Sequence, residues 1–366
     1  MSGRSRLSEL VGTALPTTMV GSYPRPSWFT WNLSGADILE ALRDEGFAEA
    51  YRDGIAAIVQ DQESAGLDVL TDGHLWYDKH QGFIQSYVLY NIERTLGIEI
   101  RPTAEFHPQS GENWKKVVEA VYSGESVIVG KLERGPMRHA LNWSLAQRCT
   151  PSPVKASFAA GPIGLANKVR DPDRHYRDWR AVARDWAEIF RAEILESVAA
   201  GARVIQFDDL WFSAEERDWP FAVEVVNSIL TGIPAFVIWH ACHGGAPSPV
   251  GNAPYARMFP YVRELEVDAV EWAFAETGFP EEDLRLFEDH DVGLGMGVIS
   301  VKNFVIETPD EVAAAIRKAL RHVSPERLHL TTDCGLYAYP RPAALAKLRA
   351  LVDGVRIVRA ELGDLP

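Results

Sequence analysis

The sequence predicts an α/β protein, a (β/α)8 TIM barrel with an antiparallel element inserted after the second strand. Short apolar runs alternate with long amphipathic stretches, eight such units follow one another, and one long segment interrupts the alternation. Alternating strands and helices imply a parallel sheet, and eight units close that sheet into a barrel. Barrels of this class often exceed ~250 residues as one unit, so we expect residues 1–366 to form a single domain.

The expected strands are short and apolar. AFVIW at residues 235–239 is an unbroken apolar run, which is typical of a strand covered on both faces. The eight expected strands are Thr18–Gly21, Leu67–Leu70, Val154–Phe158, Val204–Phe207, Ala235–Trp239, Ala269–Val270, Val292–Gly295 and Leu328–Thr331.

The expected helices lie between these strands. Ala36–Ala65 and Trp179–Ala199 place apolar residues at helical spacing. Pro309–Arg321 follows Thr308, which suits an N-cap, and carries Glu311 in its first turn. The segment from about residue 73 to 153 is too long for an ordinary loop. It contains two strand-like runs, Ile98–Pro102 and Ser126–Arg134, so we interpret it as an antiparallel excursion that could help to build a lid.

Composition narrows the possible partners and the compartment. The formal net charge is −14, and an acidic surface repels nucleic acid and anionic membranes, so neither is an expected partner. No uncharged apolar stretch is long enough for a membrane span. The first residues carry Arg4, Arg6 and Glu9 instead of an apolar signal-peptide core, so we expect a cytoplasmic protein. Three cysteines argue against a disulfide framework and leave metal-bound or catalytic roles open.

Polar side chains follow several of the expected strands at their carboxyl ends, and in a barrel these ends meet at one mouth. Two thiols, one imidazole and one carboxylate form a donor set that suits tetrahedral Zn²⁺. Ligands drawn from distant strand ends fit a catalytic metal better than a local structural site. Core packing remains an alternative for each residue taken singly, and Cys149 has no partner in this pattern. The candidates are His240, Cys242, Glu271 and Cys334, with Asp208 and Asp209 beside them.

Seven motifs occur in order along almost the whole chain, from Thr17 to about Val355. They are TTMVGSYPRP at 17–26, TDG at 71–73, IQFDD at 205–209, HAC at 240–242, VDAVE at 267–271, GVISVKNFVIETPDEV at 297–312 and ERLHLTTDCGL at 326–336. This ordered set resembles the catalytic domain of cobalamin-independent methionine synthase. It resembles still more closely the short single-barrel relatives of that domain, which include archaeal-type methionine synthases and epoxyalkane:coenzyme M transferase.

The resemblance implies a site of stated composition. The zinc ligands of the family fall on His240, Cys242, Glu271 and Cys334. The anchors of the thiol substrate fall on the turn Val20-Gly21-Ser22, which would grip a carboxylate or another anion, and on Asp208, which would pair with an amino group; Asp209 lies beside it. Gly21 allows a ligand to approach the backbone closely, and Ser22 adds a hydroxyl donor.

Two departures from the family pattern bear on the substrate. Methionine synthases carry a Glu after TDG, facing the homocysteine ammonium, whereas this chain has His74. They carry a His in the loop after the seventh strand, where this chain has Lys302. An imidazole cannot replace a carboxylate that faces an ammonium. The segment from His74 to His80 contains several groups that could donate a proton, namely His74, Tyr77 and His80, and Lys302 is another. A solvated loop is the simpler interpretation of this segment.

Three functions remain open. The first is zinc-dependent methyl or alkyl transfer to a small-molecule thiol, with methyl-folate, a methyl-corrinoid or another electrophile as the alkyl donor; Zn²⁺ deprotonates a bound thiol, which otherwise titrates near 8.5. The second is a lyase-type addition or elimination of a thiol on an epoxide or related electrophile, in which His74, Tyr77, His80 or Lys302 could protonate the developing alkoxide. For the protein as a whole, Asp208, His74 and Lys302 are the candidate catalytic side chains. The third is a non-catalytic metal-binding barrel, and the sequence does not decide the oligomeric state.

Overall fold

The computed structural model describes residues 4–79, 87–102, 124–209, 216–241 and 255–363. Seven parallel strands form one curled sheet in the order β1-β4-β6-β7-β8-β9-β10. Their bounds are β1 Leu70–Thr71, β4 Val154–Phe158, β6 Val204–Asp208, β7 Phe236–Ala241, β8 Ala269–Ala273, β9 Gly293–Ile299 and β10 Leu328–Thr332.

An extended N-terminal segment lies between the two edges of this sheet. Thr17 forms a parallel bridge with Leu330 of β10, and Ser22 forms one with Gly73, just after β1. The expected first strand, Thr18–Gly21, therefore fills the eighth place of the barrel without being a regular ladder strand.

Side chains replace part of the missing ladder in this segment. The Val20 amide donates to the Thr332 hydroxyl at 3.1 Å, and the Thr71 hydroxyl donates to the Gly21 carbonyl at 2.7 Å. Hydroxyls of the neighbouring strands thus satisfy backbone groups that a regular strand would pair with backbone.

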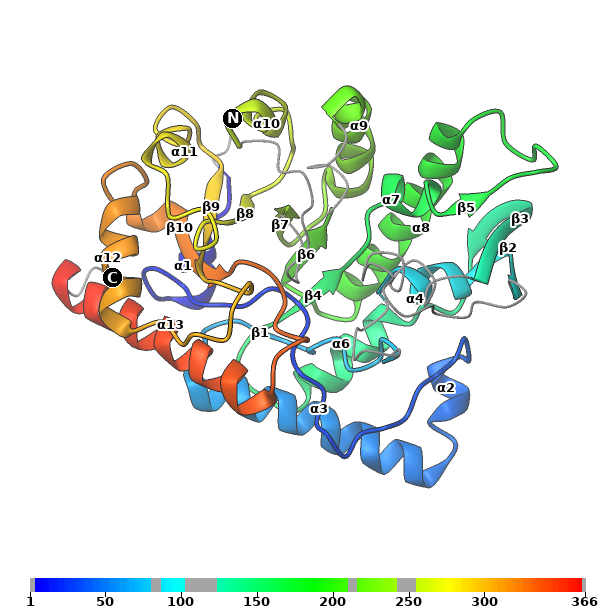
Figure 1. The fold of residues 1–366 in the computed structure, drawn as a ribbon, viewed down its shortest axis with the longest axis horizontal. Coiled ribbons are helices and arrows are strands. Elements are labelled where there is room, and N and C mark those ends of the chain that lie inside the picture. The colour runs from blue at the N-terminus through cyan, green and yellow to red at the C-terminus, as the bar shows by residue number, and fades with distance from the viewer. Residues whose placement is uncertain (1–3, 80–86, 103–123, 210–215, 242–254, 364–366) are drawn as a thin grey trace, which may run out of the picture.

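In the described part of the chain, eight helices ring the sheet and close the barrel. In the order α3-α6-α8-α9-α10-α11-α12-α13 each helix contacts the next, and α13 contacts α3 (Figure 1). This closed ring confirms the predicted barrel. No helix of the described ranges is both long and apolar enough to cross a membrane. The bounds are α3 Glu45–Ala65, α6 His139–Gln147, α8 Trp179–Ala199, α9 Trp219–Leu230, α10 Tyr255–Val262, α11 Glu281–Arg285, α12 Pro309–Ala319 and α13 Arg341–Leu362.

Local signals set the helix ends. Helix α8 has the expected bounds, and Asp178 caps it by accepting from the Ala181 amide at 2.9 Å. Helix α12 begins with the expected capping box of Thr308 and Glu311 and ends at Ala319, two residues before the expected end. The described helices also include four short α-helices and two 3-10 turns: α1 Leu7–Val11, α2 Ile38–Ala41, α4 Tyr87–Glu93, α7 Pro162–Ala166, Glu216–Asp218 and Pro325–Arg327.

The expected helix Ala36–Ala65 is divided into α2 and α3. Asp44 lies between them in an extended conformation, and its side chain accepts from the Phe47 amide at 2.8 Å. An aspartate that caps a new helix start in this way interrupts an otherwise continuous helical pattern. The apolar spacing therefore predicted the buried face correctly but not the break.

The interrupting segment contains the expected antiparallel element. Strand β2, Thr95–Pro102, pairs antiparallel with β3, Gly124–Arg134. A short strand that the sequence did not reveal, β5 at Val169–Arg170, adds to β3 in parallel. Figure 1 shows this small sheet outside the helix ring, beside α8.

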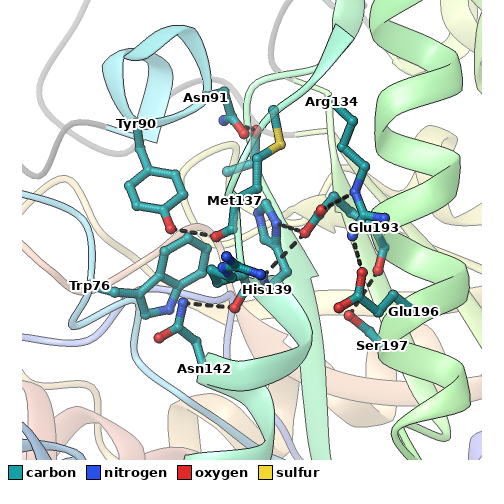
Figure 2. Close-up of polar contacts among 12 residues, drawn as sticks. Trp76, Tyr90, Asn91, Arg134, Met137, His139, Asn142, Glu193, Glu196 and Ser197 are labelled. Carbon is teal, nitrogen blue, oxygen red and sulfur yellow. Dashed lines mark hydrogen bonds and ion pairs between the residues drawn. The ribbon is translucent and has the colours of Figure 1, made fainter. Parts of the chain in front are cut away.

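One buried carboxylate anchors the inserted element to the barrel wall. Figure 2 shows Glu193 of α8 between His139, at the start of α6, and Arg134, at the end of β3. Glu193 Oε2 accepts from His139 Nδ1 at 2.8 Å, and Glu193 Oε1 pairs with the Arg134 guanidinium. His139 packs edge-on against Trp76, in the loop after β1, with ring centroids 4.9 Å apart. The contacts of Glu193 with Arg134 and His139 therefore attach the insertion to α8, and the packing of His139 on Trp76 supports the loop that carries His74.

Candidate functional site

Strand register places the central candidates in one row at the barrel mouth. Asp208 of β6 is the register partner of His240 of β7, and His240 is the partner of Glu271 of β8. The row continues through Gly295 of β9 to His329 of β10. Register partners in a parallel sheet present their side chains on the same face, so the order of the strands alone brings these groups together.

Glu271 is completely buried and its two oxygens have different surroundings. Oε1 lies 3.0 Å from His329 Nε2 and 3.4 Å from Lys155 Nζ. Oε2 has no hydrogen-bond partner and lies 3.8 Å from His240 Nδ1. Burial raises the pKa of Glu271, but Lys155, His329 and His240 outweigh it and lower the pKa to about 2. The carboxylate is therefore ionised, with one oxygen directed at an imidazole.

His240 is buried, and among the described residues neither ring nitrogen has a nitrogen or oxygen atom as hydrogen-bond partner, while the Cys334 thiol lies close enough to interact with the ring. Burial lowers the pKa of His240, but the Cys334 thiol and the carboxylates of Asp208 and Glu271 outweigh that effect and raise it. Cys334 follows β10 and is also buried. Its carbonyl accepts from the Thr332 hydroxyl at 2.7 Å, which fixes the backbone of the loop.

These atoms fit a metal ion in their chemistry. An unpartnered buried imidazole nitrogen or carboxylate oxygen costs ~1–3 kcal/mol, and a cation between His240 and Glu271 would satisfy both. In the ranges that the structure describes, no three His, Cys, Asp or Glu side chains gather closely enough to hold a metal. The fourth expected ligand, Cys242, lies outside the described residues.

Asp208 is buried at the end of β6, and Gln206 Nε2 donates to its Oδ1 at 2.5 Å. Burial raises the pKa of Asp208 to about 6, against the lowering effects of His240 and Gln206. A cationic partner would stabilise the ionised form of this buried carboxylate. Asp209 differs, because a Cβ atom on Gly161 would meet its Oδ1 at 2.6 Å. Its carboxylate therefore packs against the backbone that follows β4.

The Val20-Gly21-Ser22 turn lies beside Cys334. A Cβ on Gly335 would meet the Ser22 hydroxyl at 2.0 Å, and the Leu336 amide donates to the Ser22 carbonyl at 2.8 Å. The Val20 amide is already bonded to Thr332. Within the described ranges the Gly21 and Ser22 amides make no such bond, so these two donors and the Ser22 hydroxyl are the groups that could receive an anion.

His74 packs directly against this turn. A Cβ atom on Gly21 would meet His74 Cε1 at 2.5 Å, so only glycine leaves room for the ring. His74 has φ of +53°, a left-handed conformation that costs ~1–3 kcal/mol in a non-glycine residue and clusters at functional sites. The Asp72 carboxylate stabilises the turn by accepting from the His74 amide at 2.9 Å. Burial lowers the pKa of His74, and its Nε2 has no described partner.

Of the three remaining expected residues, Lys302 and Tyr77 belong to the described part of the chain. Lys302 follows β9, and its ammonium lies 3.6 Å from Glu276 Oε2 in the loop after β8. Tyr77 is buried near His74, with ring centroids 4.7 Å apart. His80 lies outside the described residues.

Sequence reasoning missed two residues of the barrel interior, Lys155 and His329. Both lie inside strands that were expected from apolar runs, VKASF and LHLTT. The available signal was the residue type itself, because a charged side chain in a fully buried strand needs a partner. Which partner each one finds depends on strands far away in the sequence.

A family model described as the catalytic domain of cobalamin-independent synthase matches residues 15–86 and 109–356 of the chain. The unmatched stretch between these ranges contains α4 and β2. The motifs at the barrel mouth all fall within the matched residues.

Two curated relatives span nearly the same length as the chain. A methionine synthase of Saccharolobus islandicus is 30% identical over 352 residues, covering 95% of this chain and 96% of the relative. A methionine synthase of Sulfurisphaera tokodaii is 30% identical over 356 residues, covering 95% and 94%. The solved structure of a B12-independent methionine synthase from Shewanella, in complex with selenomethionine, has a TM-score of 0.78. It is 24% identical and covers 96% of this chain and 99% of its own, and this likeness bears on the fold.

Proposed function

The chain belongs to the family of cobalamin-independent methionine synthase catalytic domains, and we propose that it transfers a methyl or alkyl group to a small-molecule thiol with the help of one zinc ion. Membership of this family makes it a methyltransferase of the methionine synthase type. The observation that carries the finer proposal is the row of Asp208, His240 and Glu271, in which the imidazole and one carboxylate oxygen are buried 3.8 Å apart and have no nitrogen or oxygen hydrogen-bond partner among the described residues.

The proposed zinc ligands are His240, Cys242, Glu271 and Cys334. A bound Zn²⁺ would keep a substrate thiol deprotonated at neutral pH and thereby nucleophilic. The protein contributes a dry environment, because His240, Glu271 and Cys334 are all buried. It also fixes direction, because β7 and β8 hold the imidazole and the carboxylate in adjacent register positions.

The proposed substrate contacts lie on either side of these ligands. Asp208 would pair with a substrate ammonium, which offsets the burial of its carboxylate. The Gly21 and Ser22 amides and the Ser22 hydroxyl would receive a carboxylate or sulfonate. Asp209, packed against Gly161, would support this side of the mouth without touching the substrate. Lys302, in the loop after β9, would face the incoming donor.

A second candidate is thiol addition to an epoxide or a related electrophile. One observation favours it: His74 holds a strained backbone conformation and presents a buried, unpartnered ring nitrogen beside the anion-binding turn. An opening epoxide develops an alkoxide that needs a hydrogen-bond or proton donor, and a neutral imidazole can supply one. Methyl transfer from a methyl-corrinoid makes no such demand, whereas transfer from methyl-folate needs a proton on the leaving nitrogen.

Metal analysis joined to turnover tests the proposal. We expect about one zinc per purified chain, and we expect Cys334→Ser and Cys242→Ser to lose most of it together with alkyl transfer, because each removes a thiolate ligand. Cys149→Ser is the matched control, since Cys149 is exposed and belongs to no expected ligand set. Full zinc occupancy in the Cys334→Ser protein would contradict the ligand assignment.

Product analysis separates the two candidates. Homocysteine with a methyl donor should give methionine under the first, and an aliphatic thiol with an epoxide should give a hydroxyalkyl thioether under the second. Mass spectrometry of both reactions with the same zinc-loaded enzyme identifies the product directly.

A further inference from the structure

The side chains of Lys155 and His329 both contact one oxygen atom in the barrel interior, Oε1 of Glu271. Lys155 is completely buried on β4, and its ammonium reaches Glu271 Oε1 on β8, although β6 and β7 separate these two strands in the sheet. The contact therefore crosses the interior of the barrel. His329 approaches the same oxygen from β10, with β9 between it and β8.

Gly295 makes this convergence possible. It lies on β9 between Glu271 and His329 in the row of register partners. A Cβ atom at this position would lie 2.3 Å from Glu271 Cγ and 2.4 Å from His329 Nε2. The side chain of any other residue would push the Glu271 carboxylate and the His329 imidazole apart, so glycine at this position allows the two groups to meet.

We propose that Lys155 and His329 are positioning residues that hold Glu271 by Oε1 and leave Oε2 alone to face His240 and the metal. This inference rests on the proposed zinc site and adds the device that orients one of its ligands. With Oε1 held by two donors, only Oε2 would remain for a metal, and a rotation that offered both oxygens would break the contacts with Lys155 and His329.

The two carboxylate oxygens of Glu271 differ in their partners: Oε1 contacts two donors, and Oε2 has no hydrogen-bond partner. Hydrogen bonds to a charged group are about twice as strong as neutral ones, so two donors on Oε1 fix the carboxylate plane. An ammonium buried as deeply as that of Lys155 is costly unless it is paired, and the carboxylate across the barrel is its described partner. Partners that orient a metal ligand contribute ~10–100-fold to metal affinity.

A double-mutant cycle on zinc affinity tests the proposal independently of activity. The dissociation constant for Zn²⁺ is measured by competition with a chromogenic chelator for Lys155→Met, His329→Ala and His329→Gln. We expect the first two to bind zinc ~10–100-fold more weakly. Glutamine keeps a side-chain N–H donor, so His329→Gln should recover part of the affinity lost in His329→Ala.

The same substitutions are then made in a Glu271→Gln background. If Lys155 and His329 act through the Glu271 carboxylate, they should weaken zinc binding there by less than about threefold, because coupled residues are non-additive. Equal losses in both backgrounds, or no loss in either, would overturn the proposal.

Lys347→Met is the matched control. Lys347 is also a buried lysine with a carboxylate partner, 2.9 Å from Glu307 Oε2, but it lies on the outer helix α13. Its substitution should leave zinc affinity unchanged. Far-UV circular dichroism and thermal unfolding of the metal-free proteins check folding, and the histidine variants retain the test if Lys155→Met does not fold. A wild-type protein that binds no zinc would contradict the proposed function itself.

Discussion

Individual residues of the barrel interior depart from what an apolar core requires. Lys155, Asp208, His240, Glu271 and His329 are all buried on strands, where charged or titratable groups are expensive unless they are paired. Lys155 and His329 both contact one oxygen of Glu271, whereas the other oxygen has no hydrogen-bond partner and lies 3.8 Å from His240. A buried carboxylate oxygen left in this way beside an imidazole indicates where a ligand belongs.

Asp208→Asn should weaken the binding or turnover of an amino-bearing thiol while leaving zinc content unchanged. The substitution keeps the shape of the side chain but removes the charge that a substrate ammonium would meet. A charge-assisted hydrogen bond contributes ~1.5–3 kcal/mol, so we expect kcat/KM to fall ~10–150-fold. Steady-state kinetics beside metal analysis measure both quantities, and unchanged kinetics with a zinc-loaded variant would mean that Asp208 is structural.

His74 bears on the identity of the substrate. If the natural reaction is not methylation of homocysteine by methyl-tetrahydrofolate, the wild-type protein should convert this pair poorly, and His74→Glu should raise conversion by supplying a charged partner for the ammonium. His74→Gln, which adds no charge, is the control. Methionine formation by the wild type at a kcat/KM of ~10⁴ M⁻¹s⁻¹ or above would show that His74 carries no such specificity.

At the scale of elements, the inserted β2–β3 pair is attached to the barrel through Glu193 on α8. Burial raises the pKa of Glu193, but His139 and then Arg134 outweigh it and lower the pKa below its ordinary value. A carboxylate with a lowered folded-state pKa stabilises the protein above its unfolded-state pKa, and that contribution disappears as the pH falls through the folded-state pKa.

Glu193→Gln should therefore destabilise the protein in a pH-dependent way. At pH 7 we expect a loss of ~1–3 kcal/mol in the free energy of unfolding, because the amide leaves buried donors without an anionic partner. The difference from the wild type should begin to shrink below pH ~4.5, where the carboxylate of the unfolded state becomes protonated, and should disappear as the pH falls through the lower pKa of the folded state. Chemical denaturation at several pH values measures this difference.

Glu224→Gln is a matched control on the neighbouring helix. Glu224 also pairs with an arginine, Arg184, but its side chain is 57% exposed. Surface ion pairs contribute ~0–1 kcal/mol, so this variant should show little loss at any pH. An equal and pH-independent loss in both variants would contradict the role given to Glu193.

At the scale of the whole molecule, the proposed ligands come from β7, β8 and the loop after β10, so a metal would link distant parts of the chain. A ligand that binds only the native state stabilises it by ~2.7 kcal/mol when present at 100 times its Kd. For 366 residues this corresponds to a rise of about 3.5 °C in Tm. We expect removal of zinc by a chelator to lower Tm by about this amount in differential scanning calorimetry.

The Cys334→Ser protein provides the comparison for this measurement. It should unfold near the Tm of the chelated wild type and should not respond to the chelator. A chelator-induced shift of equal size in both proteins would mean that the stabilising metal lies elsewhere.

Periodicity and residue type determined much of this protein in advance. The alternation of apolar runs and amphipathic stretches predicted the barrel, the antiparallel insertion and the bounds of α8, because these patterns depend on neighbours within a few residues. The positions of polar residues at strand ends predicted that Asp208, His240 and Glu271 would lie side by side, because parallel strands present their carboxyl ends at one mouth.

The tertiary structure decided what depends on register and on contacts across the barrel. The first strand became an extended segment, because hydroxyls of Thr71 and Thr332 satisfy part of its backbone. Asp208 and Asp209 are adjacent in sequence, yet alternation along the strand sends one beside His240 and the other against Gly161. The pairing of Lys155 with Glu271 crosses the barrel between residues 116 positions apart. Local patterns carry no information about such a contact, because the closure of the whole sheet sets its distance.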